Sequence, residues 1–256
     1  MAVRSLDLPD AIMTADLLLA LCMMLGAALY SSVGHAGASS YIALMALFGV
    51  PAMVMRPTAL ALNVIVATLA SIRFIRAGLF RWRTLWPFLL GALPFAFIGG
   101  ALQLPGHVYR PIVGVVLLCS AVRLLWSPEL KAAEEWHDPP VWLAILCGAG
   151  IGLLSGLTGT GGGIFLSPLL LFLAWSAPRP ASGVAAVFIL FNSVSGLLGN
   201  FSSVRSLPPL LPLYAGAVMI GGVIGTTLGI RLATPVILRC LGVVLVVAGA
   251  KLIGVY

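Results

Sequence analysis

Two glycine-rich breaks interrupt the apolar runs of this chain, and they carry residue types suited to binding an anion. The longer break is Gly159-Thr160-Gly161-Gly162-Gly163, and a degraded copy, Gly34-His35-Ala36-Gly37-Ala38, lies 125 positions earlier. Glycine costs about 1 kcal/mol against alanine inside a helix, so each break predicts an unwound or closely packed backbone. Within a lipid bilayer such a backbone persists only where protein or a polar cavity covers it.

A glycine-rich turn before a helix holds an anion without a formal charge, because backbone N–H groups and the positive end of the helix dipole face the ligand. The other interpretation is that the glycines only let helices pack closely. The predicted substrate-binding residues are Gly34, His35, Gly37, Ser39, Asn63, Thr158, Gly159, Thr160, Gly161, Gly162, Gly163 and Asn192.

Several polar side chains within these apolar regions have two interpretations each. His35 binds an anion or carries a proton, or it is a neutral histidine bonded to a backbone carbonyl. Asn63 and Asn192 face the substrate or join one helix to another, and the helix-joining role is the favoured one. Arg56 lies at the start of an apolar helix on the outer side, where it attracts anions or snorkels to the interface, and snorkelling is the favoured interpretation.

Acidic residues are absent from the apolar regions, since none lies between Asp16 and Glu129 or after Asp138. A carboxylate proton relay or sodium site within the membrane is therefore not expected, and an anionic substrate is favoured. No carboxylate pair, metal cluster or activated nucleophile is apparent, so we expect neither an enzyme nor a cofactor nor a metal site. The glycine run lacks the Lys and Ser/Thr of a nucleotide-binding loop, because Gly162 and Gly163 stand in their places.

The composition is that of an all-α polytopic membrane protein. Of 256 residues, 61% are hydrophobic and 8% are charged, against about 25% charged in soluble domains. The net charge of +7 comes from basic residues at the ends of apolar runs, so it does not indicate nucleic-acid binding. The expected helical segments are the apolar blocks 15–30, 38–50, 58–72, 85–102, 108–125, 141–154, 164–175, 181–198, 210–230 and 235–253.

These blocks divide into two homologous halves of four to five helical segments each. The expected boundaries are a first repeat over 1–126, a cytoplasmic linker over 127–140 and a second repeat over 141–256. Pro51 and Asn63 match Pro180 and Asn192 at an offset of 129, about one helical turn more than the offset between the breaks. Paired, glycine-interrupted segments in an internal repeat point to the binding site of a transporter.

Charge bias leaves the number of spanning segments open. With ten spans the amino terminus is outside and the halves form an inverted repeat. If the short blocks 38–50 and 164–175 are re-entrant, eight segments span, the terminus is inside and the repeat is parallel. Both topologies place residues 73–83 and the linker in the cytoplasm, with nine of the 14 basic residues inside.

The segment from Gly156 to Leu169, GLTGTGGGIFLSPL, resembles the glycine-rich motif of the TauE/SafE sulfite exporter family. The segments 52–71 and 181–199 resemble the helices that follow the motif in each half, and in the first half His35 and Ala36 replace residues of the motif. The resemblance implies a multi-pass permease of the bacterial inner membrane that exports sulfite, sulfoacetate or a related sulfur-containing or organic anion.

The sequence therefore predicts a secondary transporter whose partners are a small anion and the lipid bilayer, with no nucleic acid and with homo-oligomerisation left open. Its two breaks are expected to meet near the bilayer midplane, and access alternates as the halves rock. Coupling is to the proton gradient or to the membrane potential alone. The alternative is a non-transporting membrane scaffold or assembly factor in which the glycines are packing contacts.

Overall fold

The computed structural model describes residues 8–32, 34–125, 137–201, 207–229 and 235–254, and within these ranges the chain forms ten helices and no strand. Each of the ten predicted blocks overlaps one helix, so the all-α prediction is confirmed. The helices are α1 Leu8–Ser31, α2 Ala38–Leu47, α3 Ala52–Arg76, α4 Trp82–Ala101, α5 Gly106–Leu125, α6 Val141–Thr158, α7 Gly163–Phe172, α8 Pro178–Gly199, α9 Leu211–Gly229 and α10 Pro235–Ile253.

The helices differ in whether they can cross a bilayer. Six of the described helices, α1, α3, α4, α6, α8 and α9, are long and apolar enough to do so. By contrast, α2 and α7 have ten residues each. At 1.5 Å per residue each rises only about 15 Å, half of a ~30 Å hydrocarbon core. Neither short helix spans the membrane by itself.

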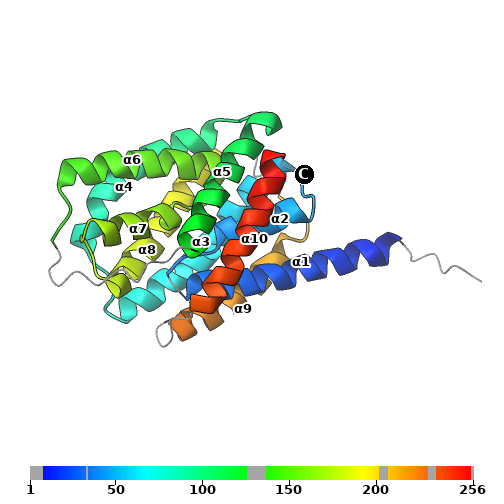
Figure 1. Ribbon diagram of the computed structural model, residues 1–256, viewed down its shortest axis with the longest axis horizontal. Helices are drawn as coiled ribbons and strands as arrows, with labels where there is room; N and C mark the ends of the chain where they lie inside the picture. The colour runs from blue at the N-terminus through cyan, green and yellow to red at the C-terminus, as the bar shows by residue number, and fades with distance from the viewer. Residues whose placement is uncertain (1–7, 33, 126–136, 202–206, 230–234, 255–256) are drawn as a thin grey trace, which may run out of the picture.

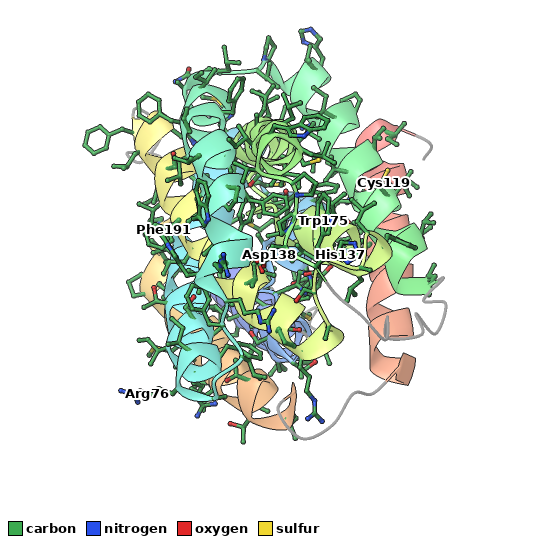
Figure 2. The ribbon with its side chains drawn as sticks, turned by 90° about the vertical axis from the view of Figure 1, so that its left-hand side faces the viewer. Arg76, Cys119, His137, Asp138, Trp175 and Phe191 are labelled. Atoms are coloured by element: carbon green, nitrogen blue, oxygen red, sulfur yellow. The ribbon has the colours of Figure 1, made fainter. Side chains whose placement is uncertain are left out.

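The outside of the bundle is apolar. Large hydrophobic side chains such as Trp142 and Phe172, each 66% exposed, cover its periphery. Figure 2 shows Phe191 and Cys119 on outer faces of the bundle as well. A soluble monomer rarely exposes so continuous an apolar surface, whereas lipid accommodates it. The protein is a multi-pass membrane protein.

Glycines every fourth residue bring two pairs of helices into backbone contact. On α6, a Cβ at any of three such glycines would collide with a carbonyl oxygen of α4, and two glycines of α9 face α1 in the same way. Residue numbers increase in the same direction along the two helices of each pair, so the helices are parallel. The glycine–carbonyl contacts are Gly148 with Phe88, Gly152 with Ala92, Gly156 with Ala96, Gly221 with Met24 and Gly225 with Ala28.

The two halves of the sequence interleave in space. In the bundle of Figure 1, α4 of the first half lies beside α6 and α8 of the second, and α9 and α10 lie beside α1 and α5. The antiparallel pair α5 and α10 is also in close contact, with Gly114 and Leu118 of α5 against Gly249 of α10. Packing in the membrane therefore depends on contacts between the halves as much as within them.

We predict that Gly152→Ala destabilises the protein by about 1–3 kcal/mol, because its new Cβ meets the Ala92 backbone, which has no room to yield. The measurement is thermal unfolding of the purified protein in detergent, followed by tryptophan fluorescence. Gly150→Ala is the matched control, since a Cβ on that exposed face of α6 meets nothing within 4 Å. Equal melting temperatures for the two variants would contradict the close contact between α4 and α6.

Candidate functional site

Both glycine breaks are unwound, as the sequence predicts. Gly34 and Gly37 have φ values of +79° and +102°, and Gly159, Gly161 and Gly162 have +85°, +77° and +78°. This left-handed backbone costs a residue with a Cβ about 1–2 kcal/mol but is open to glycine. Gly37 and Gly162 are the N-cap residues of α2 and α7, so each break leads directly into one of the half-length helices.

The two breaks touch each other through His35. The Nε2 atom of His35 lies 3.0 Å from the carbonyl oxygen of Gly163 and 3.2 Å from Oγ of Ser167 on α7. A carbonyl only accepts hydrogen bonds, so Nε2 carries the proton and donates it. On the other side of this break, a Cβ at Gly34 would collide with Ser182 of α8. The first break is thus enclosed by elements of the second half.

Asn63 of α3 joins both breaks. Its Oδ1 accepts the backbone N–H of Ala38, at the start of α2, at 3.1 Å, and its Nδ2 donates to Oγ of Ser193 on α8 at 3.1 Å. A Cβ at Gly161 would collide with the same Nδ2. Asn192 of α8 donates to the carbonyl oxygen of Gly161 at 3.3 Å. Asn63 thus links the start of α2 to α8, and Asn192 links α8 to the second break.

The twelve predicted site residues are all buried, and most come together. His35, Gly163, Asn63, Asn192 and Gly161 belong to one contact network between the breaks. The threonines lie at the other end of the second break, where the two hydroxyl oxygens of Thr158 and Thr160 are 3.0 Å apart. Ser39 is buried in the first turn of α2, beyond its N-cap Gly37.

The electrostatics of this region come from helix ends rather than from carboxylates. Asn63 contacts the start of α2 and the break that leads into α7, so the positive ends of both helix dipoles lie near this side chain. The described carboxylates are engaged elsewhere: Asp16 accepts from Tyr214 at 2.7 Å, and Asp138 pairs with Arg83 at 3.8 Å. Among the described residues no cluster of His, Cys, Asp and Glu suits a metal ion.

The environment of Arg56 differs from the one that the sequence predicts. The predicted snorkelling is wrong: Arg56 is 6% exposed, and its guanidinium donates to carbonyl oxygens at the ends of two helices. The accepting carbonyl groups are those of Gly100, of Leu102 at 2.9 Å and of Leu157 at 3.5 Å. No local signal reveals this, because the carbonyls belong to α4, the residue after it and α6, which are distant in sequence.

A helical bundle with an apolar periphery, and with unwound backbone covered at its centre, defines a multi-pass membrane protein of the kind that moves solutes through such a site. The comparisons with known proteins agree. The family described as sulfite exporter TauE/SafE matches residues 18–252. The chain belongs to the TauE/SafE family, so it is a membrane transporter and not an enzyme.

Two relatives illustrate the match. A protein of Sinorhizobium fredii named as a probable membrane transporter is 40% identical over 239 residues, which cover 92% of this chain and 97% of the relative. A probable membrane transporter protein of Methanocaldococcus jannaschii is 27% identical over 115 residues, 44% of this chain and 42% of that protein. No solved structure matches the chain.

We predict that Asn63→Ala lowers stability by about 1–3 kcal/mol, because it leaves the buried N–H of Ala38 without its acceptor. Asn192→Ala is the matched comparison, and it removes a single, longer hydrogen bond to Gly161. Its melting temperature in detergent is expected to lie between those of wild type and Asn63→Ala. A larger loss in Asn192→Ala would show that Asn63 does not hold the two breaks together.

Proposed function

We propose that the protein is a secondary transporter that moves a small anion, such as sulfite, sulfoacetate or a related sulfur-containing or organic anion, across the bacterial inner membrane. The observation that carries the proposal is the meeting of the two breaks, with His35 of one bonded to Gly163 of the other. The family's description as a sulfite exporter supports this substrate class. So does the acid-free stretch of sequence around each break.

In this proposal the anion is held by backbone N–H groups and polar side chains of the twelve predicted residues. The positive ends of α2 and α7 supply about half an elementary charge each, and this is not screened by water in a buried site. The His35 N–H that now donates to Gly163 becomes available to an oxyanion when the contact between the breaks opens. Neutral donors release an anion more readily than a fixed lysine or arginine would.

We further propose that the halves 1–126 and 141–256 are inverted repeats joined by the cytoplasmic linker 127–140, of which residues 127–136 lie outside the described residues. The packing supports this. When the two halves are exchanged, α1 corresponds to α6 and α4 corresponds to α9. The parallel pair α1 and α9 then corresponds to the parallel pair α6 and α4, and glycines four residues apart lie in both contacts. In the same exchange α5 corresponds to α10, so this antiparallel pair corresponds to itself, as an inverted repeat requires.

Each break together with its short helix then forms one passage across the membrane, which gives ten segments and an external amino terminus. The site lies between the repeats near the midplane, and rocking of the interleaved bundle exposes it to either side. An anion that leaves a negative-inside cell gains about 2.3 kcal/mol per charge per 100 mV, which is sufficient to drive export.

Gly162→Leu is expected to abolish anion efflux, because its side chain fills the space beside Asn192 and forces a left-handed backbone to carry a Cβ. The measurement is loss of radiolabelled sulfite from proteoliposomes. Gly150→Leu is the control, since it adds the same side chain to an open face of α6. Its efflux is expected to equal that of wild type.

Asn192→Asp provides a second variant of nearly unchanged shape. A carboxylate beside Gly161 repels an anion, so we expect efflux to fall at least about tenfold. Full efflux from both variants, with reconstitution and melting temperature like those of wild type, would contradict the binding site. Absence of efflux from the wild type for every tested anion would favour the scaffold alternative.

A further inference from the structure

Arg56 poses a physical problem that its hydrogen bonds do not solve. Arg56 is 94% removed from solvent, and the three carbonyl groups that its guanidinium contacts are neutral. Among the described residues the ion pair is Arg83 with Asp138, so no described carboxylate balances the charge of Arg56. Its Nε also has no partner among these residues. A buried charge without a counter-ion is unfavourable, and an anion in contact with it would offset this cost.

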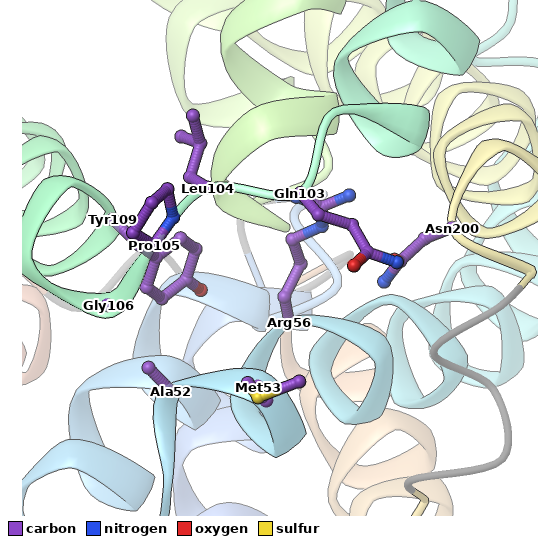
Figure 3. Close-up of a pocket in the computed structure, with 9 residues that line it drawn as sticks. All are labelled: Ala52, Met53, Arg56, Gln103, Leu104, Pro105, Gly106, Tyr109 and Asn200. Atoms are coloured by element: carbon purple, nitrogen blue, oxygen red, sulfur yellow. The ribbon is translucent and has the colours of Figure 1, made fainter.

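A cavity of about 310 Å³ lies directly against this guanidinium. Figure 3 shows Arg56 rising from α3 into the cavity, with Tyr109 on one side and Gln103 and Asn200 on the other. Asn200 is 97% removed from solvent, and its side chain lines the cavity. The amino end of α5, at Gly106, also faces the cavity and adds the positive end of a helix dipole.

The cavity adjoins the second glycine break. A Cβ at Gly159 would lie 3.0 Å from Cγ of Arg56, and the Tyr109 hydroxyl donates to the carbonyl oxygen of Thr158 at 3.1 Å. It lies at the start of α3, the end opposite to Arg73 and Arg76. Arg56 thus contacts both the second break and the cavity.

We propose that this cavity is a second anion site, at the extracytoplasmic mouth of the transport path, that takes a sulfonate or similar oxyanion with a short apolar group. Arg56 and the start of α5 balance the charge, and the amides of Gln103 and Asn200 donate to the oxyanion. Apolar surface from Leu104 and Pro105 accommodates the organic part. The location on the transport path rests on the proposed function, whereas anion binding in the cavity does not.

The two ends of the bundle differ in this feature. At the offset of 129 that relates Asn63 to Asn192, the counterpart of Arg56 is Ala185, which is fully buried and apolar. A cationic site that is present at just one mouth lowers the energy of the anion on that side of the membrane. Such an asymmetry favours capture or release there without a matching site in the cytoplasm.

The test uses Met53→Cys in the full-length protein. Met53 is 73% exposed at the rim of the cavity, so this change is expected to leave the fold intact. The rate of alkylation of the new cysteine by N-ethylmaleimide is measured by mass spectrometry with and without ethanesulfonate. Ethanesulfonate replaces sulfite because sulfite adds to the maleimide itself. We expect ethanesulfonate to slow alkylation at position 53 at least about fivefold, whereas alkylation of the exposed Cys119 on α5 stays unchanged.

Ethylammonium, which has the same ethyl group and the opposite charge, is expected to give no protection. Adding Arg56→Gln is expected to abolish the protection by ethanesulfonate. If that variant does not fold, Asn200→Asp keeps the shape of the cavity, and its carboxylate is expected to abolish the protection. Protection that is equal for both probe charges, or unchanged in the folded variants, would overturn the site, as would no protection at all.

The same protein separates this proposal from the proposed function. In the Gly162→Leu background the second break is blocked, while the cavity residues are unaltered. Protection at position 53 is expected to persist there while efflux is lost. Efflux by the wild type without protection would overturn the mouth site alone, and protection without efflux in the wild type would overturn the transport proposal and the location on its path, but not anion binding in the cavity.

Discussion

The structure depends on one constraint: unwound backbone inside a membrane must find hydrogen-bond partners within the protein. Two segments of this chain leave the helical ladder, and side chains from other elements satisfy them. Asn63 accepts from Ala38, and Tyr41 donates to the carbonyl oxygen of Ala36 at 2.6 Å. Asn192 donates to the carbonyl oxygen of Gly161 in the second break. These contacts fix where the breaks lie, and therefore where the positive ends of α2 and α7 point.

Close helix packing makes those contacts geometrically attainable. Glycines on α6 and α9 let these helices approach the backbones of α4 and α1, which belong to the opposite half of the sequence. Lipid provides little hydrophobic drive for helices to associate, so such close van der Waals contact is a main source of stability. The interleaving that results encloses both breaks in the bundle. It also means that a conformational change has to move contacts between the halves and not one half as an isolated body.

The glycine breaks and the buried asparagines could be predicted from the sequence because each depends on a property of the residue itself. Glycines in an apolar run predict a break wherever the run folds, since the preference for positive φ is a property of the residue. Buried asparagines predict hydrogen bonding, because an unpaired amide is costly in lipid. What these rules do not supply is the partner. That Asn63 touches both breaks, or that His35 meets Gly163, requires α3 and α7 to be placed relative to one another.

The sequence by itself determined the membrane setting, the ten helical segments, the two glycine breaks and the family resemblance, because composition and local backbone preference are written residue by residue. Only the tertiary structure decided that the breaks touch, that the halves interleave and that Arg56 is buried beside a cavity. The physical reason is that the environment of Arg56 consists of carbonyl groups 44 to 101 positions away in the chain. No local pattern encodes such an environment, and the same arginine at a lipid interface would have the same neighbours in sequence.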